Sequence, residues 1–172
     1  LKILETPGHT WESISLVLYD KSSSEHPIGV FSGDALFIGD VGRTDFYPER
    51  VEECAGLLYD SIFEKLLPLG DHVILYPGHG AGSVCGGGIA TREFSTLGFE
   101  RMNNPALQFP DKDEFIRAKA GETHAKPPYF SMMEEYNQKG APAIHPLHPP
   151  RPFHADQFDE AMQDGMIAVD IR

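Results

Sequence analysis

The chain has 172 residues, a length that suits one domain or slightly more. Its formal net charge of −12, from 14 basic and 26 acidic residues, argues against nucleic acid or an anionic membrane surface as a partner. The apolar fraction of 41% is enough for a packed core, and no apolar run approaches the ~18 residues of a membrane span. Two cysteines, Cys54 and Cys85, indicate no disulfide framework, so we expect a reducing, cytoplasmic location.

The predicted elements begin with strands and continue with helices. Strands are expected over residues 2–5, 14–19, 28–32 and 72–76, where apolar and β-branched residues lie between turn signals. Helices are expected from Pro48 through residue 67 and over 95–104, 111–121, 127–140 and 155–165, followed by a strand over 166–170. This order is typical of an α/β or α+β fold, in which the polar residues of interest lie at strand ends.

A proline-rich stretch, APAIHPLHPPRPFH at residues 141–154, predicts an extended linker between two parts of the chain. The first residues, LKILE, and the last, MIAVDIR, both have the composition of strands without a continuation. We therefore expect the chain to be a fragment of a larger protein, with one domain before the linker and the start of another after it.

Three polar side chains share one local pattern. His9 follows a Pro-Gly turn, Asp34 follows a strand and a glycine, and His79 follows a strand and a second Pro-Gly turn. Glycine allows a sharp turn of the backbone, and imidazole and carboxylate are ligands that suit zinc or iron. Each residue taken alone could be an ordinary polar loop residue, but the repetition of the pattern at three strand ends predicts a shared metal site.

Three further residues are candidates for contacts near that site. Arg43 and Asp45, in GRTDF, are expected to pair and hold the loop after Asp34, with substrate contact as the alternative. Cys85 lies six residues after His79 in a glycine-rich loop, where either an idle thiol or a thiol at the site is consistent with the sequence. The same loop lacks the Lys-Ser/Thr pair of a phosphate-binding P-loop, which argues against a phosphate site.

The segments TPGHT, FSGDALFIGDVGRTDF and LYPGHGAGS together resemble the second half of a metallo-β-lactamase-fold enzyme. Within that superfamily they are similar to the persulfide (sulfur) dioxygenases and their glyoxalase II relatives. The stretches GHGAGSVCGGGI and STLGFERMNNPAL resemble the branch that is fused to a rhodanese. The tail, DQFDEAMQDGMIAVDIR, resembles more weakly the opening helix and first strand of a rhodanese domain.

This resemblance implies a fold and a domain organisation. Residues 1–140 would be the C-terminal part of an αββα metallo-β-lactamase sandwich with a helical extension, and residues 155–172 the beginning of a rhodanese-like α/β domain. The other sheet of the sandwich would lie largely upstream. The apolar face of the strands over 13–19, 28–32 and 72–76 is therefore expected to lack its cover.

The resemblance also implies a ligand set. In two-metal hydrolases of this fold the equivalent of Asp34 bridges the metals and that of His79 binds the second one. In the dioxygenases a single iron is bound by a first-motif histidine with the equivalents of His9 and Asp34. That first motif, His-x-His-x-Asp-His, does not occur in the 172 residues and would lie upstream of Leu1. Trp11 also departs from the family, which usually has a proline there.

The implied activity is that of an Fe(II)-dependent dioxygenase, which oxidises a low-molecular-weight thiol persulfide to sulfite and free thiol. Glutathione persulfide is the default substrate, so the expected partners are this persulfide and dioxygen, with neither nucleic acid nor membrane. Two alternatives stay open: a Zn²⁺-dependent glyoxalase II-like thioester hydrolase, and an inactive half-domain that acts as a binding module. A homo-oligomer or a complementing chain segment also stays open. With His9 and Asp34 as its donors, the isolated chain is expected to bind metal weakly and to be inactive.

Overall fold

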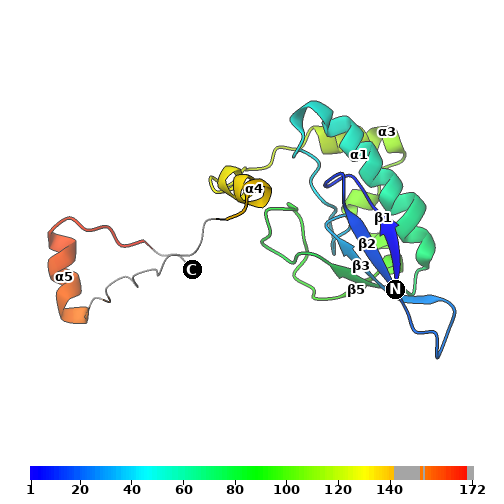
Figure 1. Ribbon diagram of the computed structural model, residues 1–172, viewed down its shortest axis with the longest axis horizontal. Helices are drawn as coiled ribbons and strands as arrows, with labels where there is room; N and C mark the ends of the chain where they lie inside the picture. Colours follow the sequence, from blue (N-terminus) through cyan, green and yellow to red (C-terminus); the bar gives the residue numbers. More distant parts are fainter. Residues whose placement is uncertain (142–151, 153, 170–172) are drawn as a thin grey trace. The chain divides into compact units, whose positions relative to one another are not determined.

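The computed structural model describes residues 1–141, 152 and 154–169 (Figure 1). The chain divides into two compact units, Leu1–Lys126 and Pro127–Arg172, and each is described by itself. The strands of the first unit are β1 (Lys2–Glu5), β2 (Ile14–Tyr19), β3 (Pro27–Gly33), β4 (Ile74–Pro77) and β5 (Ser95–Thr96). Its helices are α1 (Val51–Asp60), α2 (Leu97–Asn103) and α3 (Lys112–Ala120), with a π-helical segment at Ser61–Leu66 and 3₁₀ turns at Pro48–Arg50, Leu67–Leu69 and Pro105–Leu107. The described helices of the second unit are α4 (Phe130–Lys139) and α5 (Ala155–Gln163).

The strands of the first unit form one sheet with the order β1-β2-β3-β4-β5, and α1 and α3 lie on one side of it (Figure 1). The pairs β1–β2 and β2–β3 are antiparallel, as short loops require, and β4–β5 is antiparallel too. The pair β3–β4 is parallel, because α1 and the helical turns after it form the crossover between these strands. The C-terminal ends of β3 and β4 therefore lie at the same edge of the sheet, beside the N-terminal end of β2.

One face of the sheet is the buried core. Val17, Val30 and Leu75 lie opposite one another on β2, β3 and β4, and each is 0% exposed. They belong to the same apolar cluster as Leu58 of α1 and Phe115 of α3, and these two helices pack against each other (Figure 1). Burial of each such side chain stabilises the fold by roughly 1.5–3 kcal/mol relative to exposure.

The opposite face of the sheet is apolar and exposed. Ile3, Phe31 and Tyr76 lie on one row across β1, β3 and β4, and they are 64%, 44% and 38% exposed. The rings of Phe31 and Tyr76 stack with their centroids 5.0 Å apart, and Ile14 and Ile74 extend the surface. We call these five residues the open sheet face. The expected lack of cover on these strands is confirmed for the described residues, and such surfaces mark interaction sites.

Most predicted elements are confirmed, because their signals are local. The strands over 2–5 and 14–19 match β1 and β2, and the long helical run that begins at Pro48 is present. Asp111 caps α3 as predicted, since its Oδ1 accepts a hydrogen bond from the backbone N–H of Glu114 at 2.9 Å. The described part of the chain therefore has the order of strands and helices that the sequence predicted.

Two predicted elements differ from the structure. The helix expected from Ser95 begins two residues later, because Ser95 pairs with Leu75 of β4 and the Thr96 hydroxyl caps α2 by accepting from the N–H of Phe99 at 3.2 Å. The strand expected over 166–170 is absent from residues 166–169, since a strand needs a neighbour whose pairing local sequence does not specify. Of the predicted linker, residues 142–151 and 153 lie outside the described residues. Within the described residues, no helix is both long and apolar enough to cross a membrane.

Glu100 in α2 is a buried carboxylate that ties this helix to the loop after β3. It is 0% exposed. Its Oε2 accepts hydrogen bonds from the backbone N–H of Gly39 at 2.7 Å and from Asn104 Nδ2 at 3.1 Å. Its Oε1 accepts from the Ser95 hydroxyl at 2.5 Å. Asn104 Nδ2 also donates to the backbone oxygen of Asp40 at 3.1 Å, so the loop is held at two points. Burial of this carboxyl group is tolerated because both of its oxygens accept hydrogen bonds, and Arg92 Nη2 also lies 3.4 Å from Oε1.

We predict that Glu100→Ala lowers the free energy of unfolding by roughly 3 kcal/mol, because it leaves several buried donors without an acceptor. Urea denaturation followed by circular dichroism measures the change. Glu93→Ala, at a nearby exposed position, is the control and is expected to stay within about 0.5 kcal/mol of the unsubstituted chain. Equal urea midpoints for the two variants would contradict the structural role given to Glu100.

Candidate metal site

The three strand-end residues predicted from the sequence lie at one edge of the sheet. His9 is in the loop between β1 and β2, Asp34 follows β3, and His79 lies two residues beyond β4. The parallel pairing of β3 with β4 brings Asp34 close to His79, and the antiparallel pairing of β2 with β3 brings the loop that carries His9 to the same edge. The topology, rather than nearness in sequence, assembles the group.

His9 is oriented as a metal ligand. The residue is 7% exposed, and its Nδ1 lies 2.9 Å from the backbone oxygen of Arg43. Because a carbonyl only accepts, Nδ1 carries a proton, and in a neutral ring Nε2 then presents a lone pair. Nε2 lies 3.2 Å from Oδ2 of Asp34. A proton on Nε2 makes this contact a hydrogen bond to Asp34, and a metal ion in its place would receive a lone pair from each residue.

Asp34 is held from its other side by His79. His79 Nδ1 lies 2.8 Å from Asp34 Oδ1, and the His79 side chain is 45% exposed. Burial by itself would raise the pKa of Asp34, but the hydrogen bonds and charges of His9 and His79 outweigh it, so the pKa lies below its ordinary value. The Asp34 carboxylate is therefore ionised at neutral pH, as a metal ligand must be.

Two glycines, Gly42 and Gly78, allow this close approach; the sequence indicated Gly78 only as part of a turn and did not single out Gly42. A Cβ on Gly78 would collide with the carboxylate of Asp34. A Cβ on Gly42 would collide with the backbone of Asp34 and would lie 3.0 Å from Nδ1 of His9. The only sequence signal for this role was their position in the VGR and PGH segments. That signal is ambiguous, because a glycine next to a candidate ligand can equally well be there to form a turn.

Arg43 and Asp45 form a two-point ion pair. Arg43 Nε and Nη2 donate to the two carboxylate oxygens of Asp45 at 2.6 and 2.7 Å. Arg43 Nη1 donates to the backbone oxygens of Val84 at 3.1 Å and Ala125 at 3.3 Å, and the side chain is only 3% exposed. The guanidinium thus joins three separate stretches of backbone around the site.

Cys85 lies with the ligand pair. Its Sγ, a nitrogen of His9 and a carboxylate oxygen of Asp34 all lie within 4.8 Å of one another. His79 does not belong to this group of three, although it bonds to Asp34. Burial raises the pKa of the Cys85 thiol, and the neighbouring Asp34 carboxylate raises it further. The sequence left the role of this thiol open, whereas the structure places it at the predicted ligands.

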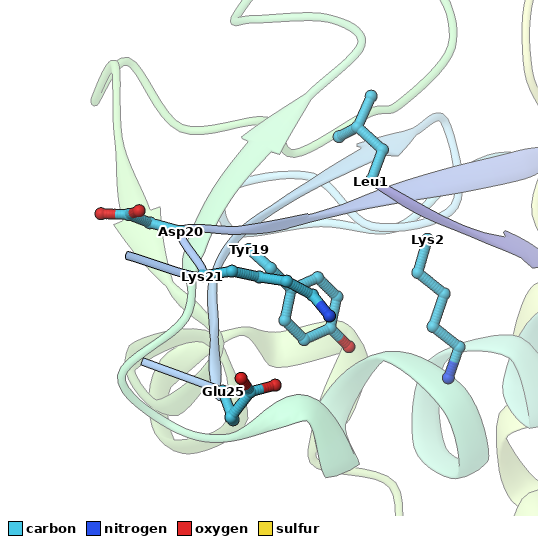
Figure 2. A pocket seen from close by; sticks show the side chains of 6 residues that line it. All are labelled: Leu1, Lys2, Tyr19, Asp20, Lys21 and Glu25. Carbon is cyan, nitrogen blue, oxygen red and sulfur yellow. The ribbon is translucent and has the colours of Figure 1, made fainter. Parts of the chain in front are cut away.

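Two hollows lie near the ends of the strands. One, of about 450 Å³, is lined by Tyr76, His79 and Arg92 among others, and it opens beside the site. The other, of about 550 Å³, is lined by Leu1, Lys2, Tyr19, Asp20, Lys21 and Glu25. Figure 2 shows charged side chains of both signs around its Tyr19 ring. This second hollow lies at the start of β1 and the end of β2, away from His9.

Comparison with known proteins finds relatives with two different activities. No family model matches the chain. The mouse persulfide dioxygenase ETHE1 is 32% identical over 139 residues, which are 81% of this chain and 47% of that protein. The hydroxyacylglutathione hydrolase GloC of Haemophilus influenzae is 37% identical over 106 residues, 62% of this chain and 40% of that protein. The chain therefore spans less than half the length of these curated relatives.

Solved structures agree with this comparison. A metallo-β-lactamase from Staphylococcus aureus superposes with a TM-score of 0.74 at 38% identity, covering 84% of this chain and 42% of that one. ETHE1 from Myxococcus xanthus gives a TM-score of 0.61 at 29% identity, covering 81% of this chain and 54% of that one. The chain thus has part of the metallo-β-lactamase fold, and it is homologous both to persulfide dioxygenases and to a hydroxyacylglutathione hydrolase.

The Arg43–Asp45 pair predicts a dependence of stability on pH. Burial would raise the pKa of Asp45, but the hydrogen bonds and charge of Arg43 lower it below its ordinary value of 3.8. The stabilisation is therefore complete above that value and is lost as the pH falls through the lower pKa of the folded state. We predict that the free energy of unfolding falls between neutral pH and about pH 3 by a smaller amount in Asp45→Asn than in the unsubstituted chain, because the variant has no carboxylate at residue 45 to protonate.

Urea unfolding across this pH range tests the prediction. In an Arg43→Met background the same Asp45→Asn substitution should no longer change the pH dependence, because the partner that lowers the pKa is gone. Parallel stability curves for the unsubstituted chain and Asp45→Asn would show that the pair contributes nothing in acid.

Proposed function

We propose that the chain is part of a metallo-β-lactamase-fold Fe(II) persulfide dioxygenase, with a low-molecular-weight thiol persulfide as substrate and glutathione persulfide as the default. The observation that carries this proposal is the His9–Asp34 pair, in which Nε2 and Oδ2 lie 3.2 Å apart while Nδ1 of His9 is committed to a backbone carbonyl. This pair supplies two members of a 2-His-1-carboxylate face. Homology to ETHE1 over 81% of the chain supports the choice of reaction.

The donors present fit an iron(II) ion. Imidazole and carboxylate are the ligands of non-haem iron in oxygenases, and the positions opposite them stay open. When bound, iron would supply a common site for the persulfide sulfur and dioxygen. The net reaction consumes the persulfide, dioxygen and one water, and it yields the thiol, sulfite and two protons. The sulfane sulfur is oxidised and dioxygen is reduced.

Each neighbouring residue has a distinct part in this proposal. The backbone oxygen of Arg43 fixes the His9 tautomer, and His79 fixes the orientation of the Asp34 carboxylate by its 2.8 Å contact to Oδ1. The rings of Phe46 and His9 meet in a T-shaped contact with centroids 4.9 Å apart, which restricts the orientation of the imidazole. These contacts hold the ligands in position before a metal binds.

The remaining ligands are proposed to come from a first motif in a segment N-terminal to Leu1. The chain spans less than half of its curated relatives, and the motif His-x-His-x-Asp-His does not occur in its 172 residues. The same segment is proposed to cover the open sheet face, which is apolar and in register across β1, β3 and β4. One addition would thus complete both the core and the metal site.

A zinc thioester hydrolase is the second candidate. The observation that favours it is His79, which bonds to Asp34 at the place where a second metal would sit in a hydrolase, together with the similarity to GloC. The two candidates differ in the number of metal ions. The hydrolase would hold two, with His79 as a ligand of the second and a metal-bound hydroxide as the nucleophile, whereas the dioxygenase would hold a single iron without His79 as a ligand.

A rhodanese-like domain that begins at residue 155, a cytoplasmic location and a homo-oligomeric state stay predictions from the sequence. The inactive half-domain that acts as a binding module also stays as an alternative, and it leads to a different prediction for the metal content of the intact protein. It requires that no metal be bound even when the N-terminal segment is present.

The first test measures iron and oxygen uptake in the protein produced from the intact gene. We predict one iron per chain and oxygen consumption with glutathione persulfide, and a loss of iron of about tenfold or more in His9→Ala and in Asp34→Ala. Residues 1–172 alone should consume no oxygen. Unchanged iron content in both variants, or rapid oxygen uptake by residues 1–172, would show that the ligand assignment is wrong.

The second test concerns His79 and separates the two candidates. If the protein is the dioxygenase, His79→Ala should keep its single iron, because His79 acts only through Asp34. Oxygen uptake should be slower, and His79→Gln should restore part of it by renewing the hydrogen bond. Two metal ions per chain, of which one is lost in His79→Ala, would favour the hydrolase. Metal analysis by mass spectrometry gives the stoichiometry directly.

A further inference from the structure

Cys85 adds a third donor of this chain to the pair formed by His9 and Asp34. The three donor atoms lie within 4.8 Å of one another, although the residues come from three different loops. His9 is buried, and Asp34 and Cys85 are partly buried, so the group is only partly accessible to solvent. A thiol, an imidazole and a carboxylate at this spacing form a donor set for a thiophilic divalent cation.

The position of Cys85 is defined by hydrogen bonds to the rest of the site. The backbone N–H of Arg43 donates to the Cys85 backbone oxygen at 3.1 Å, while the Arg43 backbone oxygen accepts from His9. One residue therefore connects two of the three donors. The Cys85 N–H donates to the Ser83 hydroxyl at 3.1 Å, and the N–H of Gly88 donates to Asp40 Oδ2 at 2.7 Å. The loop is held before and after the thiol.

The spacing is close to that of a bound zinc ion. With metal–ligand distances of about 2.0–2.3 Å, a tetrahedral site has neighbouring donors roughly 3.5 Å apart. His9 Nε2 and Asp34 Oδ2 are already 3.2 Å apart. The thiol has to approach by only about 1 Å. Rotation about the Cys85 side-chain bonds supplies a movement of this size.

We propose that His9, Asp34 and Cys85 of this chain form a three-ligand site that can take up a thiophilic divalent cation, with zinc and its spectroscopic substitute cobalt as the probes. On binding, the thiol proton passes to the buffer, a metal–sulfur bond forms, and one water leaves the ion. The site requires no residue outside the 172. It goes beyond the proposed dioxygenase, because a soft thiolate at this position favours zinc over iron, and the metal retained would depend on whether Cys85 is engaged.

The test is an anaerobic titration of the reduced 172-residue chain with Co²⁺, monitored by the near-ultraviolet charge-transfer band that only a thiolate ligand gives. The chain offers a matched control, because its one other cysteine, Cys54, is 1% exposed in α1. We expect the band in the unsubstituted chain and in Cys54→Ala, and its absence in Cys85→Ala. Asp34→Asn, which keeps the shape of the side chain, should weaken cobalt binding about tenfold or more.

Competition with a zinc indicator provides a second readout, in which Cys85→Ala should weaken zinc binding about tenfold or more. Circular dichroism of each variant establishes that the fold is retained. A band that survives in Cys85→Ala, or no band in the unsubstituted chain, would overturn the proposal. Neither result depends on oxygen uptake by the intact protein, so failure of this site and failure of the dioxygenase proposal are distinguishable.

Discussion

The parallel pairing of β3 with β4 is the constraint on which the rest of the structure depends. Because Phe31 pairs with Tyr76 and Gly33 with Pro77, both strands end at the same edge, and Asp34 meets His79 there. In an antiparallel pair the C-terminal ends of β3 and β4 would lie at opposite ends of the sheet, and Asp34 and His79 would be far apart. The crossover that makes the pairing parallel includes α1, whose Leu58 belongs to the core on the buried face of the same strands. Core packing and site placement thus have a common cause.

Hydrogen bonds act together with apolar packing to hold the loops at this edge, where Leu36, Ile38 and Val41 belong to the core. Backbone groups in irregular loops have no ladder to satisfy them, so side chains and neighbouring loops must do so. The Glu100 carboxylate accepts a hydrogen bond from the backbone N–H of Gly39. The Arg43 guanidinium donates to the backbone oxygens of Val84 and Ala125. The backbone N–H of Arg43 donates to the backbone oxygen of Cys85, and its backbone oxygen accepts from His9. These polar contacts therefore hold His9 and the Cys85 loop in position, and the proposed metal binding would not need to rearrange them.

Elements with local signals were predictable, and elements that depend on distant partners were not. The strand alternation of β2 and the Asp111 cap of α3 are visible within a few residues of sequence. By contrast, Ser95 pairs with Leu75 instead of starting a helix, and residues 166–169 form no strand despite a β-branched composition. Strand formation is decided by what lies alongside, and no periodicity within a segment reports that.

The sequence by itself determined the chemistry that is available: a glycine-framed His9, Asp34 and His79 at strand ends, and a resemblance that comparison with ETHE1 and GloC supports. Only the tertiary structure decided how these groups meet. It placed Cys85 with His9 and Asp34, and it gave His79 a hydrogen bond to Asp34 outside that group of three. The physical reason is that loop positions follow from strand pairing and from long-range hydrogen bonds, which join residues far apart in the chain.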